Sequence, residues 1–95
     1  MKAYLVEHYQ PGASLDDLSS AVREVQRAAA AIGRRSRPVR CVQCMIVPSD
    51  EALLALFEAT SEELVRDVYA RAGIPFERIT YAVSLDQLTN LKGAR

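Results

Sequence analysis

The chain has 95 residues, and its 12 basic and 12 acidic side chains give a formal net charge of zero. This length predicts one domain, with a core over residues 3–84 and a tail over residues 85–95. A neutral chain is a poor candidate for general nucleic-acid binding. No apolar run approaches the roughly 20 residues of a membrane helix, and the first residues lack the unbroken apolar run of a signal peptide. We therefore expect a cytoplasmic protein that binds neither nucleic acid nor membrane.

The first half of the chain predicts a strand, a long helix and a second strand. Residues 3–9 are rich in strand-forming side chains. Ser14 has the features of a capping-box start, and apolar side chains recur every three or four positions over the following residues 15–32. Gly33 is the expected stop of this helix. The next strand is predicted over residues 39–47.

The second half repeats this order. Residues 52–59 predict a strand that is joined to the preceding one by a hairpin turn. A helix then begins at Thr60 or Ser61, either of which can cap it. Gly73 is its expected stop, and the last strand is predicted over residues 77–84.

The order β-α-β-β-α-β is typical of the ferredoxin-like fold. We expect a four-stranded antiparallel sheet with two helices on one face, and with the first and third strands in the middle. Residues 52–57 are six apolar residues in a row, whereas a strand with one face in water alternates. The other face of the sheet therefore needs a cover. We expect a homodimer in which two sheets pack face to face as an α+β barrel.

The opening YLVEHYQPG and the stretch LFEATSEELVRDVYARAGIPFERI resemble a family of small bacterial domains of unknown function, some of which are described as nickel-binding proteins. The resemblance runs from about Ala3 to Val83. It implies a dimeric ferredoxin-like barrel and a role with a transition metal such as nickel. Relatives often carry histidines where this chain has Gln43 and Val68, and usually an arginine in place of His8, whereas Glu7 is kept.

Glu7 and His8 are two of the four candidate metal ligands. Glu7 falls in a central strand, where a carboxylate is unusual. It points either into a barrel cavity, where burial would make it an acid or base, or to an arginine partner. His8 is the only histidine, and a single histidine near a strand end is more often a plain surface or interface residue than a ligand. Adjacent strand residues point to opposite faces, so the two cannot serve one site within a subunit.

Cys41 and Cys44 are the other two candidates, because thiolates are soft ligands for nickel, copper or zinc. In a regular strand, residues three apart point to opposite faces and lie about 10 Å apart. Cys41 would then share a face with Gln43, and Cys44 would lie on the other face. We therefore expect two separate reduced thiols, and only a bulge or turn at Gln43 would bring them together.

Three functions remain open at this stage. The first is a non-enzymatic dimer that binds a metal ion or a small ligand, with Glu7, Tyr4 and Gln43 as ligand-binding candidates. The alternative is a cofactor-free oxygenase or isomerase acting on a small organic molecule, a type of enzyme that this barrel also hosts. The third is an interaction module that uses the arginines within residues 34–40.

Overall fold

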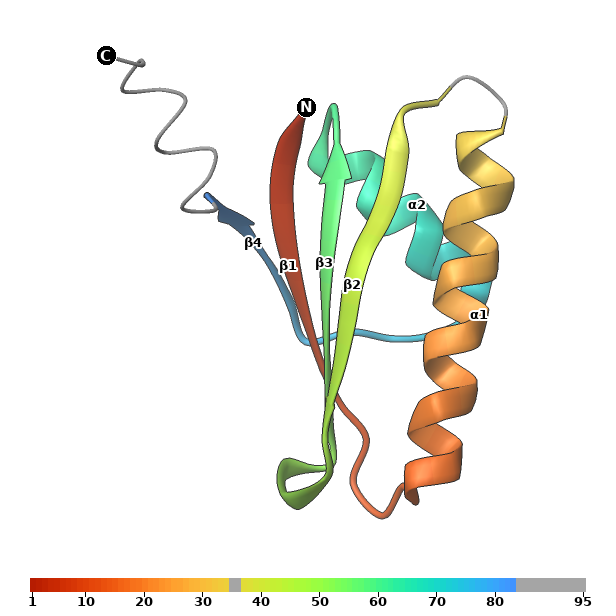
Figure 1. Cartoon of the computed structure of the whole chain (residues 1–95), viewed down its shortest axis with the longest axis vertical. Coiled ribbons are helices and arrows are strands. Elements are labelled where there is room, and N and C mark those ends of the chain that lie inside the picture. Colours follow the sequence, from red (N-terminus) through yellow and green to blue (C-terminus); the bar gives the residue numbers. More distant parts are fainter. Residues whose placement is uncertain (35–36, 84–95) are drawn as a thin grey trace.

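The computed structural model describes residues 1–34 and 37–83 as one sheet with both helices on the same face (Figure 1). The elements in chain order are β1 (Lys2–Tyr9), α1 (Leu15–Gly33), β2 (Val39–Val47), the short 3-10 helix η1 (Pro48–Asp50), β3 (Ala52–Ala59), α2 (Glu62–Ala72) and β4 (Arg78–Ala82). The four strands pair antiparallel in the order β2-β3-β1-β4. This confirms the ferredoxin-like prediction with β1 and β3 central. The tail expected over residues 85–95 lies outside the described residues.

Both helices begin at side-chain caps. The backbone N–H of Asp17 donates to the Ser14 hydroxyl at 3.1 Å, and the backbone N–H of Ser14 donates to the Asp17 carboxylate at 3.0 Å. This reciprocal pair is the predicted capping box of α1. At α2 the backbone N–H of Leu64 donates to the Ser61 hydroxyl at 3.3 Å, so Ser61 rather than Thr60 is the cap.

The two helices end differently. Gly73 ends α2 in the left-handed region with φ 73°, as predicted. The prediction that Gly33 stops α1 is wrong, because the helix includes Gly33 and is followed by Arg34 with an ordinary helical φ of −68°. A Cβ on Gly33 would lie 3.1 Å from the carbonyl oxygen of Val39. The glycine therefore allows the end of α1 to approach the start of β2.

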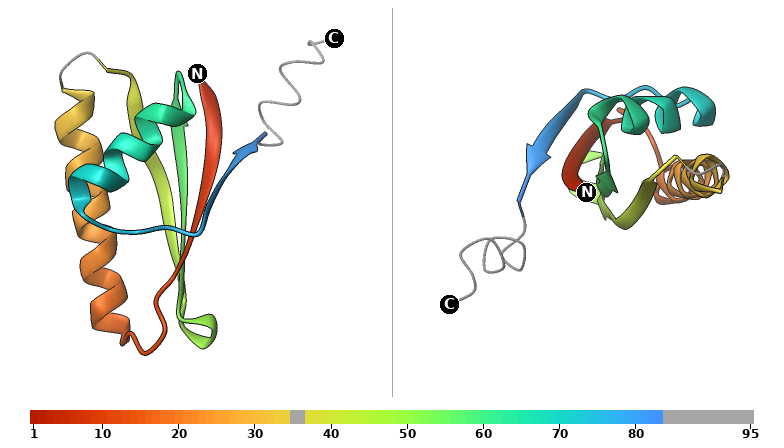
Figure 2. Two further views of the ribbon diagram at one scale, coloured as in Figure 1. Left: turned by 180° about the vertical axis from the view of Figure 1, so that it is seen from behind. Right: turned by 90° about the horizontal axis from the view of Figure 1, so that it is seen from above.

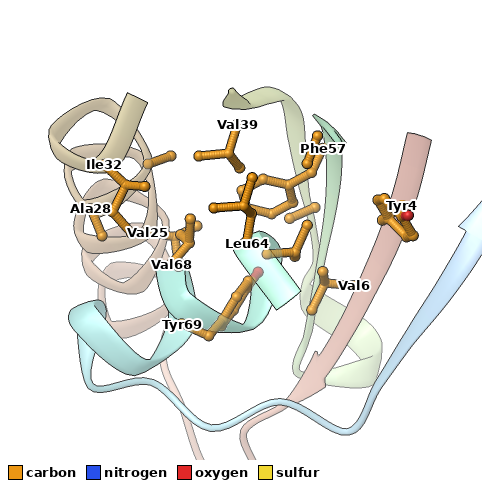
Figure 3. Close-up of a cluster of buried hydrophobic side chains, with 14 residues drawn as sticks. Tyr4, Val6, Val25, Ala28, Ile32, Val39, Phe57, Leu64, Val68 and Tyr69 are labelled. Carbon is orange, nitrogen blue, oxygen red and sulfur yellow. The ribbon is translucent and has the colours of Figure 1, made fainter. Parts of the chain in front are cut away.

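The helix-facing side of the sheet carries the core. Alternate residues of β1 and β3 point to this side, and Figure 3 shows them packed against the inner faces of α1 and α2. The strand residues of this core cluster are Tyr4, Val6, Val39, Ala55, Phe57 and Ala59, and its helix residues are Val25, Ala28, Ala29, Ile32, Leu64, Val65, Val68 and Tyr69. Neither helix of the described chain has the length and apolarity needed to cross a bilayer.

The opposite side, called the open face here, is covered by neither α1 nor α2, as the view from above in Figure 2 shows for the described residues. Leu5 of β1 pairs with Leu56 of β3 on this face, and Leu54 lies two residues along β3. All three are half-buried, whereas Met45 at the edge strand β2 is 55% exposed. The open face therefore has an apolar centre, for which the sequence predicts a cover.

Candidate metal centre

A β-bulge places both cysteines on the helix-facing side of β2. The register of β2 against β3 shifts between Cys41 and Gln43, so Val42 is an extra residue without a partner in this ladder. The three-residue step from Cys41 to Cys44 therefore spans only two residues of β3. Because residues at this spacing share a face, both thiols point toward the helices, and Gln43 points to the open face.

The two thiols are in direct contact. The Sγ atoms of Cys41 and Cys44 lie 3.4 Å apart and share a hydrogen bond. Both cysteines are free and half-buried, and both pack against the hydrophobic core. The prediction of separate thiols on opposite faces is wrong, because it assumed a regular strand. A bulge near Gln43 is expected to bring the two cysteines together, and the structure has such a bulge.

The shared hydrogen bond sets the acidity of the pair. It raises the pKa of Cys41, and burial adds to this increase. It lowers the pKa of Cys44, although burial opposes this decrease. Cys44 is therefore the thiol of the pair that loses its proton first.

Two hollows between α1 and β2 reach the thiol pair from its two ends. One, of about 410 Å³, is lined by Cys41 together with Arg40. The other, of about 340 Å³, is lined by Cys44 together with Arg23. Gln26 of α1 lines both hollows. The two half-buried cysteines thus lie beneath α1, and each borders a hollow.

His8 is buried on the same side of the sheet, with a relative exposure of 2%. This differs from the surface or interface position expected for it, because α1 and the loop after α2 cover the end of β1. Its Nε2 lies 3.2 Å from the amide oxygen of Gln10, and its Nδ1 has no hydrogen-bond partner within the described residues. His8 also lines a hollow of about 450 Å³ together with Glu24 and Ile74.

His8 does not share a site with the thiol pair. Across the sheet, Cys44 is level with Ala55 of β3 and Val6 of β1. β1 is separated from β2 by two strand spacings, or about 10 Å. His8 lies two residues further along β1. One ion cannot bridge these positions.

Glu7 and His8 point to opposite faces of the sheet, as their alternation predicts, and the structure places Glu7 on the open face. The guanidinium of Arg78 on β4 donates to its carboxylate at 2.7 Å, and the Tyr9 hydroxyl donates to it at 3.3 Å. An arginine therefore engages Glu7 within one chain, and the cavity role stays a prediction, because such a cavity would form between the open faces of two copies. Of the other ligand-binding candidates, Gln43 shares the open face, whereas Tyr4 is buried on the helix side.

Within residues 1–34 and 37–83, no three side chains of the His, Cys, Asp and Glu types converge as a metal site. The thiol pair supplies two candidate ligands in direct contact in this part of the chain. The arginine segment is partly neutralised, because Arg37 pairs with Asp67, and Arg40 pairs with Glu58 at 2.7 Å.

The fold and the thiol pair together define a small ferredoxin-like protein with two half-buried cysteines in contact beneath its first helix. The family model described as "Nickel responsive protein SCO4226-like" matches residues 4–81, and the chain belongs to this family. The crystal structure of SCO4226 from Streptomyces coelicolor A3(2) is similar, with 25% identity and a TM-score of 0.67. The match covers 86% of this chain and 98% of that chain. No curated protein matches the chain.

Tyr69 gives a first testable prediction, because it is 1% exposed and its hydroxyl has no hydrogen-bond partner within the described residues. Figure 3 shows this hydroxyl inside the core cluster. Tyr69→Phe is expected to raise the free energy of unfolding by about 1 kcal/mol at neutral pH, because it removes a buried unsatisfied group. Urea unfolding measures this change, and Tyr81→Phe, at a 59% exposed position, is the matched control. A loss of stability in Tyr69→Phe would contradict the prediction.

The same residue predicts a pH dependence. Burial, and then the nearby Cys44 and Cys41 sulfurs, raise the pKa of Tyr69 in the folded state. A raised folded pKa favours the neutral phenol, so this contribution is fully present below the unfolded pKa of about 10 and is lost as the pH rises above it. Tyr69→Phe is therefore expected to lose less stability than the wild type between neutral and strongly alkaline pH.

Proposed function

We propose that the protein binds a divalent transition-metal ion of the nickel class through the sulfurs of Cys41 and Cys44. The observation that supports this is the 3.4 Å separation of the two Sγ atoms. Two metal–sulfur bonds of about 2.3 Å hold their sulfurs about 3.3 Å apart at a square-planar angle and about 3.8 Å apart at a tetrahedral angle. The thiols are therefore already spaced for bidentate binding, and the lowered pKa of Cys44 favours it.

Two thiolates leave coordination positions open for water or for a further side chain. Closed structural sites use four protein ligands, so an ion held by only two is expected to exchange with solvent. The hollows beside Cys41 and Cys44 provide access for this exchange. An exchangeable site suits a protein of a family described as nickel responsive, because such a protein must load and release its ion as the metal concentration changes.

We further propose that the protein is a homodimer in which the open faces of two copies pack together. The half-buried leucines give this face an apolar centre. The Glu7–Arg78 and Arg40–Glu58 ion pairs leave its flanks without net charge. A neutral apolar face is complementary to an identical face. Because the thiol pair lies on the helix side, dimerisation leaves both metal sites accessible.

A native mass spectrum of the reduced, tag-free protein before and after addition of nickel chloride tests both proposals. We expect a dimer that takes up one nickel ion per chain, with thiolate-to-nickel charge-transfer absorption in solution. A monomer at micromolar concentration would overturn the homodimer. A chain that takes up no nickel, or binds it without charge-transfer absorption, would overturn the thiolate site.

A further inference from the structure

We propose that Cys41 and Cys44 also form a dithiol that is oxidised reversibly by anionic low-molecular-weight disulfides, and that oxidation closes the metal site. The regulatory part of this inference depends on the metal binding proposed above, whereas the oxidation chemistry does not. The two half-buried sulfurs already touch at 3.4 Å, and a hollow opens at each of them. Partly exposed thiols in contact with each other meet the geometric requirement for exchange.

The backbone allows a disulfide but strains it. The bulge places the two cysteines opposite β3 residues that are two apart, and Cα atoms at this spacing are about 6.6 Å from each other. Disulfides span Cα separations of roughly 4.4–6.8 Å, so this spacing is near the upper limit, and the sulfurs must approach by a further ~1.4 Å. β2 is an edge strand with a bulge at the site, and it can make this movement. A bond formed under strain is easily reduced, which makes the oxidation reversible.

The charges beside the thiols select the oxidant. Arg23 lines the hollow at Cys44 and donates to the hydroxyl of Ser20 at 3.2 Å, so its charge is not neutralised by that contact. Arg40 also borders the hollow at Cys41, but its guanidinium is held by Glu58 on the open face, so Arg23 is the cation that this proposal uses. A guanidinium beside the thiols attracts a disulfide that carries carboxylates. It also favours the thiolate form of the cysteine that attacks this disulfide.

The reaction proceeds in two exchanges. One cysteine thiolate attacks a sulfur of the small disulfide, whose S–S bond breaks, and the first small thiolate leaves. The second cysteine thiolate then attacks the protein-bound sulfur of this mixed disulfide and displaces the second small thiolate. The two protein thiols lose two electrons and their two protons, and the small disulfide is reduced to two thiols.

The test is incubation of reduced, metal-free protein with oxidised glutathione, followed by an acid quench and denaturing mass spectrometry. We expect a monomeric chain that is lighter by two hydrogens, with a link between Cys41 and Cys44 in the peptide spectra. Cys41→Ser and Cys44→Ser should each stop at a glutathione adduct. A wild-type chain that also stops at an adduct, links only to a second chain, or does not react would overturn the proposal.

The Arg23→Gln variant tests the selection of the oxidant. It should react several-fold more slowly than the wild type with oxidised glutathione and at an unchanged rate with the neutral 2-hydroxyethyl disulfide. Equal rates of the two proteins with both reagents would overturn the preference for anionic disulfides.

The regulatory part is tested with nickel. The oxidised protein should take up no nickel and should regain uptake after treatment with dithiothreitol. Nickel uptake that survives oxidation would overturn the closure of the site. Absence of uptake in the fully reduced protein would instead count against the metal proposal, and the disulfide measurement would stand independently of it.

Discussion

The Cys41→Ser/Cys44→Ser double variant is expected to bind nickel at least on the order of 100-fold more weakly than the wild type, since changes to residues that merely support metal ligands already cost 10–100-fold. Serine preserves the approximate size of each side chain, but its hydroxyl is a harder ligand that is not deprotonated at neutral pH. Each single variant should lose most of this affinity, because one thiolate cannot act as a bidentate ligand. A nickel titration followed by charge-transfer absorption and by calorimetry measures the loss.

The matched controls are Glu7→Gln and His8→Gln. Neither side chain lies near the sulfurs, because Glu7 is on the open face and His8 is two strands away, so both variants should bind nickel like the wild type. If the His8→Gln variant did not bind nickel and the double cysteine variant did, the metal site would lie in the hollow beside His8 and not at the thiols. Loss of binding in Glu7→Gln would instead indicate a site between two open faces.

The elements of this fold could be predicted because each is encoded by its own residues. Ser14 with Asp17 marks the start of α1 through local hydrogen bonds, and Gly73 ends α2 because its backbone is left-handed. The error at Gly33 has a tertiary cause. That glycine is required by the nearby carbonyl of Val39, which no spacing within the helix reveals.

The thiol pair was not predictable from spacing, since a bulge is a property of two strands. The sequence of β2 alone is compatible with regular alternation, which separates Cys41 from Cys44. The extra residue Val42 becomes evident only from the register against β3. The burial of His8 is similar, because it depends on how α1 and the loop after α2 cover the end of β1.

Phe57 and Leu56 are neighbours on β3 whose side chains point to opposite faces of the sheet. Phe57 is fully buried, and its ring lies 5.9 Å from that of Tyr69 in an edge-to-face arrangement. Phe57→Ala is expected to lower the free energy of unfolding by about 3–5 kcal/mol, because it removes buried area and leaves a cavity. Small domains have roughly 5–15 kcal/mol in total, so this variant should be close to unfolded at 37 °C. Urea unfolding measures the change.

Leu56→Ala is the matched change on the open face, and it tests whether the stability of the protein depends on dimer formation. In a homodimer packed through this face, the variant should lose stability mainly by dissociation, so its loss relative to the wild type should change with protein concentration over about a hundred-fold range. The loss in Phe57→Ala should instead be similar at every concentration, because the core lies within one chain. A small loss in Leu56→Ala that does not change with concentration would show that the open face is not a dimer interface.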